Sequence, residues 1–212
     1  MYKRVAEILF ERAVEDSANY AEQNMKDAMI FFDHSSKLKM FHYAVKQIKI
    51  DGLVGEFGVW HGKSIDTLAM LLPNKKIYGF DSFTGFKEDW TGHEYGIGDF
   101  DMKGELPNLQ QINIELVKGY FDESLPSWLE THEGPFSFIN IDCDMYGPTK
   151  TVLDLLGPSR IVSGTMILFD EYFGYTSWRQ HEYKAWQEYV EKHKIYYKYR
   201  AINHMQVLVE VL

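Results

Sequence analysis

The sequence is poor in several features that define common protein classes. Its single cysteine, Cys143, excludes an internal disulfide bond and a cysteine-based zinc site. The 22 Lys and Arg residues are outnumbered by 31 Asp and Glu residues, and no basic run is present, so we expect no nucleic-acid partner. No apolar run approaches the about 18 residues of a membrane helix, and charges interrupt the N-terminus where a signal peptide is apolar. These absences predict a soluble, cytoplasmic protein with no membrane partner.

The composition that remains is that of a folded domain. Of the 212 residues, 45% are hydrophobic and 16% aromatic, which is enough for a sizeable core. The length fits one domain with an attached segment. We place the boundary near residue 50, because residues 1–50 contain neither Gly nor Pro and repeat apolar residues at spacings of three and four. This pattern predicts three amphipathic helices that pack on the main domain, residues 51–212, or on a second subunit of a homodimer.

The main domain alternates short apolar runs with helix-like segments. This alternation predicts an α/β fold of the Rossmann-like, doubly wound type, with a mostly parallel sheet of seven strands covered by helices on both faces. The last two apolar runs, 196–203 and 206–212, are too close for a crossover helix. We therefore expect them to form a C-terminal antiparallel hairpin, which is unusual for a nicotinamide-binding Rossmann domain.

The segment 56–64, EFGVWHGKS, lies where the first strand turns into the first helix. Small residues in such a turn let a ligand approach the backbone, and the helix N-terminus presents free N–H groups. The spacing excludes a phosphate P-loop, and Trp60 and Lys63 replace two glycines of a dinucleotide fingerprint. The glycines could also serve only a tight turn. Roughly 20 residues after Gly58, Asp81 ends the next strand, where an acidic residue binds ribose hydroxyls or caps a turn.

Acidic residues follow two later strands of the predicted sheet. Asp142 ends one strand, and Asp170 and Glu171 end a later one. If the two strands are neighbours, these carboxylates meet at one sheet edge and could bind Mg²⁺ or another divalent cation, or cap the following segments. Asp144 could be a further ligand, a general base or a helix N-cap. His181 is a second base candidate, or a solvated helix residue.

Five segments together resemble the macrocin O-methyltransferase family of class I methyltransferases: GEFGVWHGKS, YGFDSFTGF, VKGYFDESLP, INIDCDMYGPTKTVLDLL and GTMILFDEY. Members of that family methylate sugar hydroxyls with S-adenosylmethionine and a divalent metal. The resemblance implies that Glu56 supports the turn, and that Glu171 stands where Asp is usual. It further implies a donor site made of Gly58, Trp60, Gly62, Ser64, Asp81, Ser82, Tyr120 and Phe121, and a metal site made of Asp142, Asp170 and Glu171.

The function predicted from these observations is metal-dependent O-methyl transfer to a small-molecule hydroxyl, such as that of a sugar. A metal ion lowers the pKa of the hydroxyl, and Asp142 or Asp144 accepts its proton. A nicotinamide-dependent oxidoreductase and a non-catalytic S-adenosylmethionine- or nucleoside-binding protein are the alternatives. We expect the N-terminal helices and the polar loop 88–111 to close over the acceptor. Trp90 and Tyr95 of this loop could stack on a sugar face or pack within the loop.

Overall fold

The computed structural model describes residues 4–32 and 36–212, so residues 1–3 and 33–35 of the predicted N-terminal helical segment lie outside the described residues. The described strands are β1 (Met29–Ile30), β2 (Leu53–Phe57), β3 (Ile77–Asp81), β4 (Ile114–Lys118), β5 (Phe136–Ile141), β6 (Met166–Phe169), β7 (Tyr197–Ile202) and β8 (Val207–Val211). The helices are α1 (Val5–Asn24), α2 (Ser36–Gln47), α3 (Lys63–Leu71), α4 (Phe121–Thr131), α5 (Tyr146–Arg160), α6 (Glu182–His193) and a short 3-10 helix, η1 (Trp178–Gln180).

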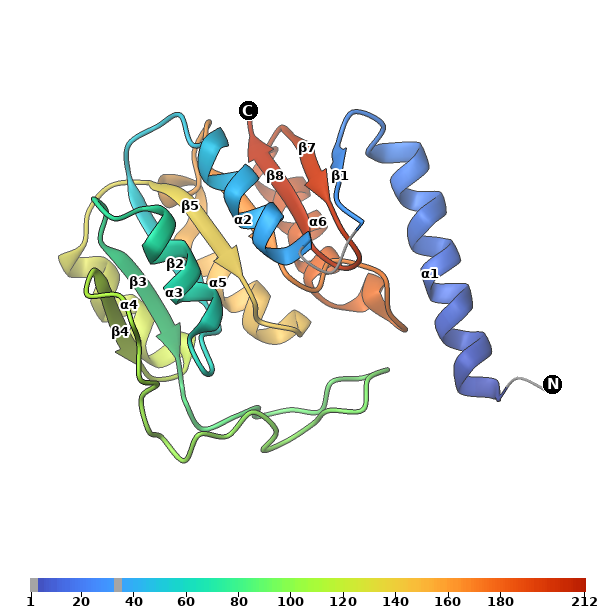
Figure 1. The fold of residues 1–212 in the computed structure, drawn as a ribbon, viewed down its shortest axis with the longest axis horizontal. Helices are drawn as coiled ribbons and strands as arrows, with labels where there is room; N and C mark the ends of the chain where they lie inside the picture. Colours follow the sequence, from blue (N-terminus) through green and yellow to red (C-terminus); the bar gives the residue numbers. More distant parts are fainter. Residues whose placement is uncertain (1–3, 33–35) are drawn as a thin grey trace.

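The strands form one sheet with the order β1-β7-β8-β6-β5-β2-β3-β4 (Figure 1). β2 pairs in parallel with both β3 and β5, and β5 pairs in parallel with β6. β8 pairs antiparallel to β6 and to β7, which confirms the predicted hairpin. The chain therefore winds outward from β2 in both directions, and the point where it reverses lies between β2 and β5. In doubly wound folds, ligands bind at the carboxyl edge of the strands at this point.

Helices cover both faces of the sheet. In Figure 1, α2 and α3 lie in front of it, and α4, α5 and α6 lie behind it. The side chains of β6 alternate accordingly: Met166 and Leu168 pack in the cluster that contains α2 and α3, whereas Ile167 and Phe169 pack in the cluster that contains α4, α5 and α6. A strand with both faces buried in this way needs a continuous apolar run, which is what the sequence MILF provides.

The N-terminal segment differs from the prediction of three helices. α1 and α2 form where the first and third apolar patterns lie, but the middle pattern, residues 25–32, is not helical. It contains β1, which pairs in parallel with β7. The sheet of the described residues consequently has eight strands rather than the predicted seven. The exposed edge of β7 offers unpaired backbone groups, and pairing with them outweighs a short helical pattern.

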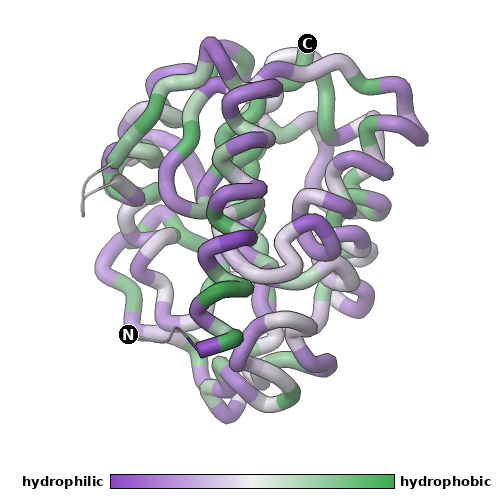
Figure 2. The backbone as a smooth tube through the Cα atoms, turned by 90° about the vertical axis from the view of Figure 1, so that its right-hand side faces the viewer, coloured by the Kyte–Doolittle hydropathy of each residue, from purple (hydrophilic) through white to green (hydrophobic). Residues whose placement is uncertain are grey.

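α1 is attached to the body by its second half. Asp16 accepts hydrogen bonds from Arg179 and from the Trp178 indole, and the Tyr20 hydroxyl meets that of Tyr199 at 2.7 Å. The first half exposes apolar side chains, among them Val5 at 73%. Figure 2 looks at the molecule from the α1 side and shows hydrophilic stretches along much of this helix. Neither α1 nor another helix of the described residues is long and apolar enough to cross a membrane.

Candidate active site

The turn after β2 depends on the absence of a side chain at Gly58. This residue has φ +95°, and a Cβ placed on it would lie 1.7 Å from the backbone oxygen of Asp142. The backbone of the turn thus passes directly over the end of β5. The N–H of Gly58 donates to Phe80 O, which ties the turn to β3 as well. Glycine at this position is required by the close approach of two strand ends.

Asp81 shapes the same turn from the end of β3. Its Oδ2 accepts hydrogen bonds of 2.8 Å from the backbone N–H groups of both Val59 and Trp60. Its Oδ1 accepts one of 2.7 Å from Phe83 N. The structure therefore gives Asp81 the turn-forming role, and Asp81 also lines the cavity described below. The assignment of Asp81 to a ribose stays a prediction, since each carboxylate oxygen can accept more than one hydrogen bond.

Glu56 holds the turn together from beneath. It is fully buried, and its carboxylate accepts hydrogen bonds from Ser64 Oγ at 2.9 Å and from Asn140 Nδ2 at 3.1 Å. Burial, followed by the charge of Asp142, raises the pKa of Glu56 well above its ordinary value. Glu56 connects the start of α3 with β5. It therefore fixes the position of Ser64, which lines the cavity described below, although Glu56 itself does not line it.

A cavity of about 860 Å³ opens at this edge of the sheet. It brings together both predicted groups of residues, those for the methyl donor and those for the metal. Glu56 and His181 are the predicted site residues that do not line it. The predicted residues that do are Gly58, Trp60, Gly62, Ser64, Asp81, Ser82, Tyr120, Phe121, Asp142, Asp144, Asp170 and Glu171.

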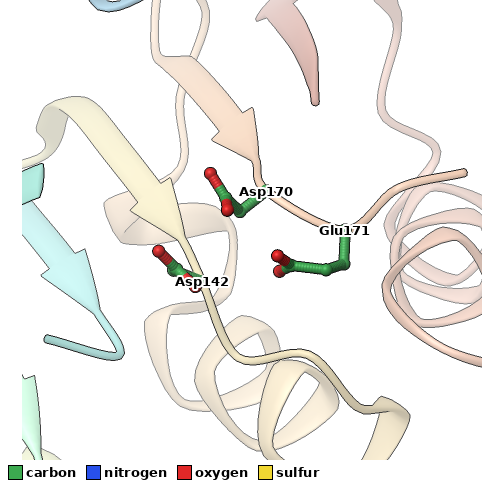
Figure 3. Close-up of side chains that lie close together, drawn as sticks. All are labelled: Asp142, Asp170 and Glu171. Carbon is green, nitrogen blue, oxygen red and sulfur yellow. The ribbon is translucent and has the colours of Figure 1, made fainter. Parts of the chain in front are cut away.

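Three carboxylates converge between the ends of β5 and β6. Asp142, Asp170 and Glu171 each have an oxygen within 4.8 Å of the others. Figure 3 shows the three side chains close together at the ends of the two strands. The convergence follows from the parallel pairing of β5 with β6, because parallel strands end at the same edge. The predicted neighbourhood of these strands is confirmed.

The cluster is buried enough to perturb its own ionisation. Burial, followed by the charge of Asp170, raises the pKa of Asp142 to about 7, against the opposing effect of Lys37. Burial also raises the pKa of Glu171, and Asp170 adds to the effect. Among the described residues, buried Glu171 Oε2 has no hydrogen-bond partner. An orphaned carboxylate oxygen beside two further carboxylates is an arrangement that a hard divalent cation fits.

Lys37 is a cluster residue that the sequence analysis missed. From α2, its Nζ donates to Asp170 Oδ2 at 2.7 Å and lies 3.8 Å from Asp142 Oδ2. Gln206, in the turn between β7 and β8, donates to the other oxygen of Asp170. Burial alone lowers the pKa of Lys37, but the charges of Asp142 and Asp170 outweigh it and raise the pKa. Nothing in the local sequence around Lys37 indicates this position, because it results from the packing of α2.

Glu182 is a second residue that the sequence analysis missed. It is fully buried at the first position of α6, and its two oxygens accept hydrogen bonds from different strand ends. Oε1 accepts from Cys143 N at 3.2 Å, and Oε2 accepts from Glu171 N at 3.0 Å. Burial, followed by the charge of Asp144, raises the pKa of Glu182. Glu182 thus clamps the backbone next to Asp142 and next to Asp170.

The two further base candidates occupy different places. Asp144 lines the cavity with φ +62°, and burial, followed by the charge of Asp142, raises its pKa. It is not a helix cap, because α5 begins at Tyr146 with Met145 as its N-cap residue. His181 is 5% exposed rather than solvated, and its Nε2 lies 2.9 Å from Thr91 O. Burial lowers the pKa of His181.

The loop between β3 and β4 supplies the aromatic wall of the cavity. Trp90, 4% exposed, is stacked on His93 with ring centroids 4.1 Å apart, and His93 is stacked on Tyr95 at 4.9 Å. Trp60, which is 44% exposed, meets Phe100 edge to face at 5.2 Å. All three of Trp90, Trp60 and Tyr95 line the cavity, but Trp90 is buried by its packing, whereas Trp60 and Tyr95 are more than one third exposed.

A family profile described as macrocin-O-methyltransferase (TylF) matches residues 16–210. Among solved structures, the calicheamicin methyltransferase CalS11 is 21% identical, with a TM-score of 0.68 and coverage of 99% of this chain and 94% of that chain. An apo structure of CalS11, described as a TDP-rhamnose 3'-O-methyltransferase of calicheamicin biosynthesis, is 20% identical, with a TM-score of 0.61 and coverage of 99% and 96%.

A more distant fold match is precorrin-6y C5,15-methyltransferase from Geobacter metallireducens GS-15. It is 11% identical, with a TM-score of 0.51 and coverage of 82% of this chain and 87% of that chain. No curated protein matches the sequence. At these identities the matches to solved structures show a shared fold, whereas the family profile spans nearly the whole chain.

Proposed function

Because this chain belongs to the macrocin O-methyltransferase family and is an S-adenosylmethionine-dependent O-methyltransferase, we propose that it methylates a hydroxyl of a sugar or another polyhydroxylated small molecule with a divalent cation bound. The observation that carries this proposal is that the turn after β2 and the carboxylate cluster line one cavity. Family membership removes the nicotinamide-dependent and non-catalytic alternatives. The sugar acceptor is supported by the similarity to CalS11, a TDP-rhamnose 3'-O-methyltransferase.

For the donor, we assign the side of the cavity between β2 and β4. The free N–H groups at the start of α3 suit the carboxylate of the methionine part. Asp81 and Ser82 take the ribose, and the rings of Tyr120 and Phe121 border the adenine. The remaining contacts of the methionine part come from Gly58, Trp60, Gly62 and Ser64, all of which line the cavity.

For the divalent cation, we assign Asp142, Asp170 and Glu171. Their oxygen chemistry suits Mg²⁺ or Mn²⁺ better than zinc. A cation bound there supplies Lewis-acid chemistry that lowers the pKa of an alcohol. Without a cation, burial and the charge of Asp170 raise the pKa of Asp142 to about 7, and a bound cation would lower it and keep this carboxylate ionised. Asp142, or Asp144 beside it, accepts the proton of the acceptor. His181 is a weaker candidate for the base, because it does not line the cavity.

For the acceptor, we assign the side of the cavity bounded by the β3–β4 loop and by α2. Exposed rings of Trp60 and Tyr95 can stack on a sugar face. Of the described part of residues 1–50, Lys37 lines the cavity, and α1 packs on η1 instead. Lys37 of α2 is therefore the described residue of the N-terminal segment that can contact the acceptor. α1 remains available for a contact with a second subunit.

The experiment that tests the proposal separates donor binding from methyl transfer. We expect excess EDTA to abolish transfer to a panel of nucleotide sugars and free glycosides, and added Mg²⁺ to restore it. S-adenosylhomocysteine affinity, measured by calorimetry, should change little on chelation. Asp81→Asn should weaken that affinity by about 1.5 to 3 kcal/mol while the protein stays folded. Full transfer in excess chelator would remove the divalent cation from the proposal, and unchanged affinity in Asp81→Asn would remove the ribose assignment.

A further inference from the structure

Both oxygens of Asp170 already have partners within the protein. Gln206 Nε2 donates to Oδ1, and the Lys37 ammonium donates to Oδ2 at 2.7 Å. The same ammonium lies 3.8 Å from Asp142 Oδ2. Lys37 therefore places one positive charge between two carboxylates of the cluster, close to the region where a divalent cation would find its ligands.

A divalent cation and the Lys37 ammonium need the same oxygen atoms. A cation shared by the three carboxylates uses a lone pair of Asp170, whose Oδ1 is held by Gln206 and whose Oδ2 is held by Lys37. Two cations bound to one carboxylate oxygen repel each other strongly where water is scarce. Each oxygen of Asp170 has a further lone pair, but this repulsion makes simultaneous binding of both cations at the cluster unfavourable.

Lys37 is able to leave. Its side chain is 52% exposed, and a lysine stem is flexible enough to carry its ammonium into water once another cation compensates the carboxylates. Asp170, in contrast, is only 9% exposed in its side chain and stays where β6 ends. An exchange of cations at the cluster consequently moves Lys37 rather than the carboxylates.

We propose that Lys37 is a resident counter-cation of this cluster, which holds Asp170 and Asp142 together until a divalent cation displaces it. The inference rests on the proposed divalent-cation site and adds a competitor to it. Two effects follow. Removing the ammonium leaves the carboxylates of the metal-free protein without compensation, which destabilises it. Removing the ammonium also eliminates the competition, which tightens divalent-cation binding.

The test is a titration of the full chain with Mg²⁺ and with Mn²⁺ by calorimetry. Lys37→Met should bind both ions at least about tenfold more tightly than the unmodified protein. Lys37→Arg keeps a cation and should retain the weaker affinity. Lys46→Met, on the exposed end of the same helix, removes a charge away from the cluster and should match the unmodified protein.

Thermal unfolding gives a second readout that does not depend on turnover. In EDTA, Lys37→Met should melt several degrees below the unmodified protein, and Mg²⁺ should raise its melting temperature more than it raises that of the unmodified protein. A variant that binds Mg²⁺ equally or more weakly overturns the inference. If neither the unmodified protein nor Lys37→Met binds Mg²⁺ or Mn²⁺, both the inference and the proposed divalent-cation site are wrong. Binding of S-adenosylhomocysteine would still support the methyltransferase assignment in that case. If turnover survives chelation and is lost in Lys37→Met, Lys37 itself supplies the positive charge needed for methyl transfer. That result would also overturn the proposed competition between Lys37 and a divalent cation.

Discussion

The two halves of the cavity are assembled by different kinds of interaction. On the side proposed for the donor, the contacts are made mainly by backbone groups. Asp81 accepts hydrogen bonds from three backbone N–H groups, and Gly58 is needed for a close approach of main chains. On the carboxylate side, distant side chains hold the cluster. Lys37 arrives from α2, Glu182 from α6 and Gln206 from the C-terminal hairpin.

This difference bears on how each half responds to change. The turn of the donor half is held by main-chain contacts between neighbouring strand ends and by the single carboxylate of Asp81, so few side-chain substitutions can disturb it. A buried carboxylate cluster depends on several elements being in place at once, and its energy changes sharply when one partner is lost. We therefore expect donor binding and methyl transfer to be separable by mutation.

The largest expected effect is that of Asp142→Asn. Under the proposed function, Asp142 is a cation ligand and a candidate base, so its loss should lower kcat by on the order of 10²- to 10⁴-fold. S-adenosylhomocysteine affinity should stay within about threefold, since the donor half is built from other residues. Asp144→Asn is the matched variant, and we expect a smaller loss. Should Asp144→Asn instead be the more damaging substitution in kcat assays, the base role moves to Asp144.

The donor half is most sharply tested by Gly58→Ala against Gly134→Ala. Both glycines have φ +95°, but a Cβ at Gly134 meets nothing within 4 Å, whereas one at Gly58 meets the Asp142 backbone at 1.7 Å. Gly134→Ala should cost about 1 to 2 kcal/mol through the backbone conformation alone. Gly58→Ala should cost at least about 2 kcal/mol more and weaken donor binding. Urea unfolding measures both, and equal losses would contradict the clash.

A smaller effect is expected from Glu182→Gln. The amide keeps one acceptor oxygen, so one of the two backbone N–H groups, of Cys143 or Glu171, is left without its partner. We expect a loss of about 1 to 3 kcal/mol in the free energy of unfolding, together with weaker Mg²⁺ binding because the strand ends are no longer clamped. Glu191→Gln, on the exposed end of α6, should stay within about 0.5 kcal/mol. Unchanged Mg²⁺ affinity in Glu182→Gln would limit Glu182 to a structural role.

The smallest effect concerns α1, outside both halves. The hydrogen bonds of Arg179 lower the pKa of Asp16 from 3.8, so the ion pair contributes stability above pH 3.8 and loses it as the pH falls through the lower folded-state pKa. Because the pair is largely exposed, Asp16→Asn should cost less than about 1 kcal/mol at neutral pH and nothing in strong acid. Glu15→Gln on the same helix controls for the charge. A difference that persists in acid would mean that packing, and not the ion pair, attaches α1.

Patterns of successive residues predicted most of the sheet. β-α alternation located β2 to β8, and the convergence of Asp142 with Asp170 followed from the parallel pairing of their strands. β1 was missed because two residues carry no periodicity, and its pairing is decided by the free edge of β7. Lys37 and Glu182 were missed for a related physical reason. Each contacts residues of other elements of the fold, and only tertiary packing determines which lysine or glutamate reaches the cluster.

The pairing of β1 with β7 has a consequence for how the protein is made. Met29 lies beside Ala201 and Ile30 beside Ile202, so β1 meets its partner only after β7 has been synthesised. On the ribosome, β2 to β6 can begin to assemble before the residues that α1 and β1 contact have been synthesised. Closure of this edge is therefore a late event in biosynthesis, and the apolar residues of α1 and β1 are those that a chaperone would meet on the nascent chain.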